Sequence, residues 1–198
     1  MNPKIVVTVA VVLLAAVGVV LWRKRSEKHR FIAIAVLTPP NTDLAFTPAT
    51  LTAAAERAWS YKFPTGAGAT DWVVGEAPIL MVKAAGFHFI VNCHQRNYFT
   101  MSPPGQAPPV PPAWAPPHAG WFSVDLMATD SPRSDEEIYS RAGALVSALM
   151  ADDTVALFLP DQGILVSLDT PSIRAQTRDA LKSSTVVASL TKLGRRPA

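Results

Sequence analysis

The chain of 198 residues contains a single cysteine, Cys93, and lacks the short patterns that mark well-known chemistries. One cysteine excludes a disulfide within the chain, which fits a reducing compartment. Gly66 and Gly68 lie close together, but no Lys-Ser/Thr pair follows them, as a phosphate-binding loop requires. No serine or cysteine lies in a recognisable nucleophile turn. We therefore assign no catalytic, metal-binding or cofactor-binding residue, and we expect no cofactor.

A basic excess is also lacking once the N-terminal region is set apart. The whole chain carries 18 Lys/Arg and 15 Asp/Glu. Residues 1–30 hold six of those bases and one of those acids, which leaves 12 bases against 14 acids in the remainder. A nucleic-acid-binding domain usually presents a basic face. We therefore expect no nucleic-acid partner.

The longest apolar run covers residues 5–22, in which Thr8 is the only polar side chain. A helix of this length measures about 27 Å, close to the roughly 30 Å of a bilayer's hydrocarbon core. A cleaved signal peptide is the alternative, but it has a shorter apolar core and a small-residue cleavage site. The segment Leu21-Trp22-Arg23-Lys24 offers no such site. The run therefore predicts one uncleaved transmembrane helix.

The residues that follow this run predict how the chain meets the bilayer. Trp22 is placed where an aromatic side chain would lie at the membrane interface, and Arg23, Lys24 and Arg25 follow it directly. Basic flanks stay on the cytoplasmic side. Residues 1–30 are thus predicted to form an anchor and its basic flank, with the bilayer as a partner. The chain would then be a single-pass membrane protein with a cytoplasmic domain.

Residues 31–190 are predicted to form one α+β domain, and residues 191–198 a frayed tail. Helices are expected after Thr47, Ser134 and Thr170, where N-cap residues precede apolar residues at helical spacing. Ser134 to Glu137 also reads as a capping box. Short apolar runs bounded by turn residues predict strands at 31–37, 72–75, 79–83, 87–93, 121–127, 154–159 and 164–168.

The order of these elements predicts the architecture. A strand, a helix and a hairpin occur in both halves of the domain, giving two β-α-β-β-like halves. Short connections favour antiparallel pairing. We therefore expect a mostly antiparallel sheet with helices on one face. Whether the two halves share one sheet is left open.

The strand at 87–93 contains residues that could suggest a metal site. His88 and His94 share one face of this strand, but six residues of extended chain separate them by about 20 Å. Cys93 points to the opposite face, with Phe87, Phe89 and Val91. One metal ion requires its ligands at about 2.0–2.3 Å. The pattern therefore favours a packed strand over a metal site.

Two other pairs of ionisable residues have alternative interpretations. His118 and Asp125 could form a general-base pair, but seven residues separate them and no nucleophile accompanies them. We favour His118 as the end of a loop and Asp125 as a partner of nearby polar groups. Asp152 and Asp153 are too few for a calcium loop and predict a polar turn.

Residues 102–118 hold eight of the chain's 18 prolines. Such density excludes a regular helix or strand pairing and favours a polyproline-type loop. The segment contains overlapping PxxP patterns, which dock into aromatic grooves at low entropic cost. A plain surface loop, with Trp114 packed back on the domain, is the alternative. The candidate docking residues are Pro108, Pro109, Pro111, Pro112 and Trp114.

Several segments taken together resemble a known group of proteins. They are Ala35–Pro39, Ala53–Trp59, Val73–Pro78, Asn97–Phe99, His118–Asp125 and Asp152–Pro160. The set is similar to small bacterial α/β modules that are known only as uncharacterised domains of unknown function. This resemblance covers residues 31 to about 170 and implies a fold and a boundary, but no activity. The present chain departs from the group by its N-terminal anchor and its longer proline-rich loop.

These observations predict a membrane-anchored, non-enzymatic module that binds another protein or scaffolds a complex. The alternative is an enzyme or small-ligand receptor whose site is not recognisable from the sequence. An enzyme should gather titratable groups from several strands in one concave pocket. A binding module should instead present an exposed apolar patch or an open sheet edge.

Overall fold

The computed structural model describes residues 32–40, 42–66, 68–101 and 113–194. The chain divides into two compact units, residues 1–31 and 32–198, and the second contains all the described residues. The expected span 5–22 and the expected interface residues Trp22, Arg23, Lys24 and Arg25 lie outside these ranges. Within them, no helix combines the length and the apolar character needed to cross a membrane.

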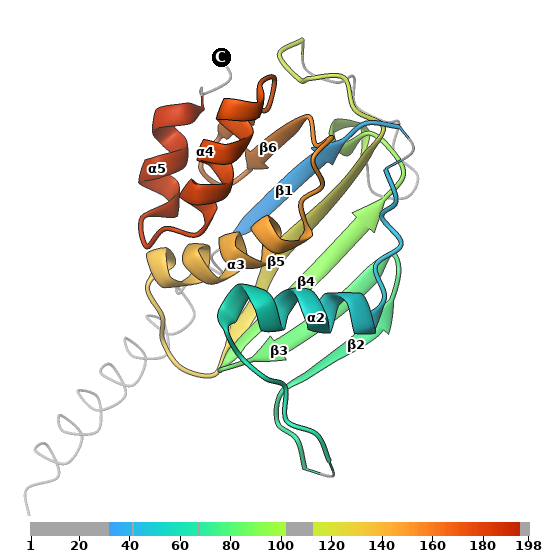
Figure 1. Cartoon of the computed structure of the whole chain (residues 1–198), viewed down its shortest axis with the longest axis vertical. Helices are drawn as coiled ribbons and strands as arrows, with labels where there is room; N and C mark the ends of the chain where they lie inside the picture. The colour runs from blue at the N-terminus through green and yellow to red at the C-terminus, as the bar shows by residue number, and fades with distance from the viewer. Residues whose placement is uncertain (1–31, 41, 67, 102–112, 195–198) are drawn as a thin grey trace, which may run out of the picture. The chain divides into compact units, whose positions relative to one another are not determined.

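The domain is built on one seven-stranded antiparallel sheet. Figure 1 views this sheet from the side of the helices. The predicted α+β class and antiparallel pairing are therefore confirmed. The strand order is β2-β3-β4-β5-β1-β6-β7. The strands are β1 (Ala33–Thr38), β2 (Trp72–Glu76), β3 (Ile79–Ala84), β4 (Phe87–His94), β5 (Gly120–Thr129), β6 (Ala156–Leu159) and β7 (Ile164–Ser167).

The two halves of the domain exchange their first strands. Strand β1 pairs with β6 of the second half, and β5 pairs with β4 of the first half. The two exchanged strands pair with each other at the centre, from Ala33 opposite Asp125 to Thr38 opposite Gly120. The halves therefore form one continuous sheet, and neither contains a complete sheet of its own.

The helices lie on one face of the sheet, as expected (Figure 1). They are α2 (Pro48–Trp59), α3 (Asp135–Leu149), α4 (Pro171–Leu181) and α5 (Val186–Leu193). Thr47, Ser134 and Thr170 each accept a hydrogen bond from a backbone N–H of the first turn, as predicted. The capping box expected at Ser134 is incomplete, since the Glu137 carboxylate accepts from Arg133 at 2.9 Å.

Helix α5 was not expected, and it includes residues 191–193 of the segment predicted as a tail. Its N-cap residue, Thr185, is of a type that often caps helices, but its side chain makes no capping hydrogen bond here. The helix instead forms because Val186 and Leu190 are buried in the core, with Leu193 packed against it. Spacings of three and four residues place these side chains on one face of the helix. Tertiary burial thus stabilises a helix that local capping does not.

The main core fills the space between the sheet and the helices. It includes Leu51 of α2, Leu145 of α3 and Val124 of β5. A second, smaller cluster lies on the opposite face of the sheet, over Leu37 of β1 and Leu165 of β7. Strand β1 is therefore buried on both faces, as its apolar sequence predicts.

Candidate binding face of the sheet

The face of the sheet away from the helices carries an apolar row on its β2–β4 side. The strand register places Val74 opposite Met81, Met81 opposite Ile90, and Ile90 opposite Asp125. Neighbouring strands lie about 4.8 Å apart, so the line from Val74 to Asp125 spans about 14 Å. We call Val74, Met81 and Ile90 the apolar row.

Solvent reaches this side of the sheet. Large apolar side chains are normally well covered, yet Val74 is 42% exposed and Ile79 is 51% exposed. Ile79 lies two residues from Met81 on β3 and points to the same face by the alternation of the strand. Met127, 45% exposed, lies at the β-bulge where β5 leaves its register with β4. Val74, opposite Met81, and Ile79, two residues from it, are neighbours on β2 and β3, and exposed apolar side chains grouped in this way are typical of binding sites.

Asp125 ends the apolar row with a carboxylate in an unusual environment. Its Oδ2 accepts hydrogen bonds from Asn92 Nδ2 at 2.7 Å and from Ser123 Oγ at 3.0 Å. Its Oδ1 is shielded from solvent and has no hydrogen-bond partner. Burial raises the pKa of Asp125 to about 6, although both hydrogen bonds act in the opposite direction. The apolar row therefore ends at a carboxylate of which only one oxygen accepts hydrogen bonds.

An aromatic cover closes the other side of this face. Tyr98 and Phe99 belong to the 3-10 helix η1 (Tyr98–Thr100). The ring of Tyr98 meets Trp121 edge to face at 5.1 Å, and Phe99 meets Trp114 at 5.0 Å. We call Tyr98, Phe99, Trp114, Trp121 and Phe158 the aromatic cover. Burial and the charge of Asp125 raise the pKa of Tyr98 to about 12, so the cover extends close to this carboxylate.

His118 holds η1 in place and does not pair with Asp125. Its Nε2 accepts the backbone N–H of Tyr98 at 2.9 Å, and its Nδ1 lies 2.8 Å from the carbonyl of Pro116. A carbonyl only accepts, so Nδ1 carries the proton. Burial lowers the pKa of His118, which favours this neutral form. Both ring nitrogens are thus occupied, and the general-base alternative has no support.

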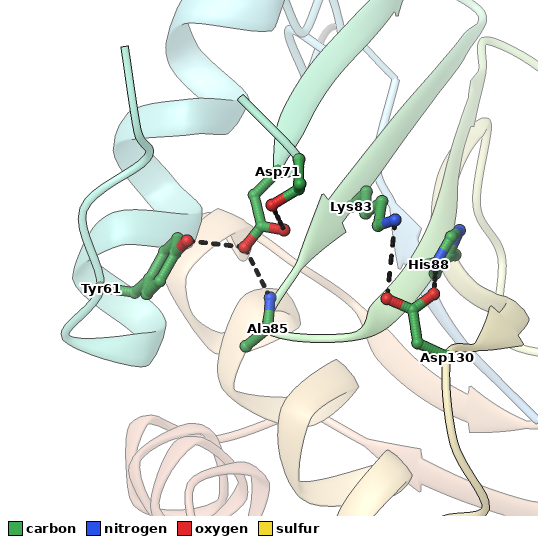
Figure 2. A network of polar contacts seen from close by, with 7 residues as sticks. Tyr61, Asp71, Lys83, Ala85, His88 and Asp130 are labelled. Carbon is green, nitrogen blue, oxygen red and sulfur yellow. Dashed lines mark hydrogen bonds and ion pairs between the residues drawn. The ribbon is translucent and has the colours of Figure 1, made fainter. Parts of the chain in front are cut away.

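A second polar network lies near the β3–β4 turn (Figure 2). Asp130 binds His88 Nε2 at 2.6 Å and Lys83 Nζ at 3.5 Å. Asp71 accepts from the hydroxyl of Tyr61 at 2.6 Å and from the backbone N–H of Ala85 at 2.8 Å. Ala85 has a left-handed φ of 52°, and its bond to Asp71 helps to hold this turn. The network is therefore largely structural.

His88, Cys93 and His94, which could have suggested a metal site, do not lie together. His88 is bound to Asp130, His94 stacks near Trp121 at 4.7 Å, and Cys93 faces the main core. This is the alternation expected from the sequence, and burial raises the pKa of the Cys93 thiol. Throughout the described ranges, no group of three or more His, Cys, Asp or Glu is placed to hold a metal ion.

The other predicted positions have simple outcomes. Asp153 accepts from Thr42 at 3.0 Å and Asp152 pairs with Arg178 at 2.8 Å, as a polar turn requires. Trp114 packs on the domain within the aromatic cover. The candidate docking residues Pro108, Pro109, Pro111 and Pro112 lie outside the described residues.

Sequence reasoning missed the apolar row and the environment of Asp125. Ile90 carries the one available signal, since it is a large apolar residue among the polar outward positions of β4. Its neighbours on other strands depend on a strand order that the sequence does not reveal.

Comparison of the chain with protein-family models, with curated proteins and with solved structures finds no match. The resemblance to uncharacterised bacterial modules therefore stays a prediction.

Proposed function

We propose that the chain is a membrane-anchored, non-enzymatic module that binds another protein, and that the apolar row together with Ile79 is the surface that receives it. The observation that carries the proposal is the exposure of Val74 and Ile79 on one face of a regular sheet. When a partner removes exposed apolar side chains from water, the free energy of the system falls, which favours binding.

The strands beneath this surface form a rigid support. Two-residue turns, Ala77-Pro78 and Ala85-Gly86, connect β2, β3 and β4. On the face opposite to the apolar row, these strands bury Leu80, Val82 and Phe89 in the main core. A partner therefore meets side chains whose positions are already fixed, so little ordering entropy opposes binding.

The proposed membrane anchoring suits a small surface of this kind. Burying one aliphatic side chain completely contributes about 1.5–3 kcal/mol, and the side chains of the row are already partly covered. A surface of this size gives a weak contact between freely diffusing molecules. Two partners held at one membrane meet at a higher effective concentration, so a weak contact suffices.

The enzyme or small-ligand alternative has less support. The described residues border a shallow hollow of about 340 Å³ at the start of α3, on the helix side. It is lined by Ser134, Glu136, Glu137, Ser140, Arg141 and Ser184. The carboxylate with the raised pKa, Asp125, lies on the opposite face of the sheet. A catalytic site would combine a carboxylate of raised pKa with a hollow that admits a substrate. Here Asp125 and the hollow lie on opposite faces of the sheet, so they do not form one site.

Photocrosslinking tests the proposal. A photoreactive phenylalanine derivative replaces Ile79 in the full chain, expressed in the cells that naturally make it. A matched chain carries the same group at Ala53, an exposed position on α2. We expect a discrete protein adduct from position 79 that Val74→Glu removes, and none from position 53. No adduct from position 79, or the same adducts from both positions, would contradict the proposal.

A further inference from the structure

We propose that Asp125 receives a basic side chain of the bound protein, so that the partner presents apolar side chains next to a lysine or arginine. This inference rests on the proposed function and specifies the chemistry of the partner. It starts from the register, in which Asp125 is the direct cross-strand neighbour of Ile90. A segment that covers the apolar row along this line reaches the carboxylate about one strand spacing, or about 5 Å, beyond Ile90.

The hydrogen bonding of Asp125 leaves room for one donor group. An ionised carboxylate can accept about four hydrogen bonds. Here Oδ2 accepts from both Asn92 and Ser123, while Oδ1 accepts none. An ammonium or guanidinium group supplies the missing donor and also the opposite charge, and such charge-assisted bonds are about twice as strong as neutral ones.

The other charges of this face favour the same partner. Lys83, the cation on the outward face of β3, is already paired with Asp130 at 3.5 Å. Glu76 is exposed at the end of β2, on the same side of the sheet as Ile79. Arg96, which lies near His94, follows the end of β4, so the part of the face around the apolar row carries the two acids Asp125 and Glu76. A basic partner complements these carboxylates, whereas an acidic partner is repelled.

The aromatic cover fits a long basic side chain. Lysine and arginine carry apolar stems that lie along apolar surface while the charged end binds elsewhere. The stem would contact Ile90 and the edge of the cover at Tyr98. Because Oδ1 is shielded from solvent, the entering group displaces a neighbouring side chain.

Two small probes separate the basic contact from simple apolar covering. n-Butylguanidinium carries the apolar stem and the cation, and n-butylurea is its neutral isostere. The full chain, in nanodiscs of zwitterionic lipid, is labelled at isoleucine and methionine methyl groups for NMR. Ile90 and Met81 then report the apolar row, and Ile173 on α4 reports the helix side. We expect a saturable shift at Ile90 with butylguanidinium and at least fivefold weaker binding of butylurea.

Two variants complete this test. Asp125→Asn is expected to weaken butylguanidinium at least fivefold, whereas Asp179→Asn, on an exposed carboxylate of α4 on the helix side, changes its affinity less than twofold. Equal binding of the two probes means that the face needs only an apolar cover, such as lipid or a second copy of the chain, and overturns the inference. This comparison uses the unaltered chain and so does not depend on the folding of a variant. Unchanged binding by Asp125→Asn overturns it as well.

Combining Asp125→Asn with the crosslinker at position 79 separates the two proposals. An adduct that persists in this chain leaves the proposed function standing and refutes the basic contact. Loss of the adduct in this chain supports the contact. Absence of any adduct before the substitution refutes the proposed function itself.

Discussion

Replacing Asp125 with asparagine is expected to stabilise the domain at neutral and alkaline pH. The amide oxygen can still accept from Asn92 and Ser123, and no charge remains to be buried. A pKa that rises from 3.8 to about 6 on folding corresponds to about 3 kcal/mol of folding free energy. The new NH₂ group takes the place of the unpartnered Oδ1 and stays without an acceptor. An unpaired buried donor costs at least about 1 kcal/mol, so we expect a net gain of about 1–2 kcal/mol at pH 8.

The sign of this effect depends on pH in a definite way. Burial raises the folded-state pKa of Asp125, so between about pH 4 and pH 6 the folded state holds a proton that the unfolded state has released. Stability of the unaltered protein from this group therefore falls as the pH rises through that window. Above about pH 6 the full cost is present. Below about pH 4 both states are protonated, and the asparagine variant loses its advantage.

Urea unfolding of the full chain in nonionic micelles, followed by tryptophan fluorescence at pH 4, 5, 6, 7 and 8, measures this difference. Asp152→Asn is the matched control, because Asp152 is a 93% exposed carboxylate paired with Arg178. It should change stability by less than about 1 kcal/mol at any of these pH values. An Asp125→Asn variant that is less stable than the unaltered chain at pH 8, or equally stable at every pH, would refute the reasoning.

Three further predictions concern the helix that was not expected, a glycine of strand β2 and the exposed face. Leu190→Ala should lower the free energy of urea unfolding by about 2–5 kcal/mol, because Leu190 is fully buried, and an unchanged unfolding midpoint would show that α5 adds nothing. Gly75→Ala should cost at least about 1–3 kcal/mol by the same assay, since Gly75 has a φ of +105° and an added Cβ would lie 2.6 Å from the Ile79 carbonyl oxygen. Val74→Ser should change stability by about 0.5 kcal/mol or less while reducing the crosslink from position 79, and a large loss of stability would mean that Val74 is part of the fold rather than of the binding face.

Local features of the fold were predictable where residues alternate with the period of a strand, or where a capping residue marks the start of a helix. The alternation of β4 follows from its period of two residues, so Phe89 faces the core and Ile90 faces outward. The starts of α2 and α4 follow from Thr47 and Thr170, each followed by a proline. Helix α5 could not be predicted in this way, because its stability comes from burial of Leu190 in a core built by distant segments.

The candidate site depends on contacts that are distant in sequence. Asp125 is unremarkable in its own strand, and its pKa is raised because the fold buries it between β4 and β1. The bonds that partly satisfy it come from Asn92 on another strand and from Ser123 on its own. Patterns along the chain report the period of each strand, but not which strand lies next to it. The register was needed to place Val74, Met81, Ile90 and Asp125 in one line.

The exchange of first strands between the two halves has a consequence for synthesis. When the ribosome has made residues up to the end of β4, β1 has neither of its neighbours, since β5 and β6 are still to come. The nascent first half therefore exposes both edges of an apolar strand until residue 129 emerges. Chaperone occupancy on stalled chains should thus fall sharply only after β5, and then β6, has left the exit tunnel.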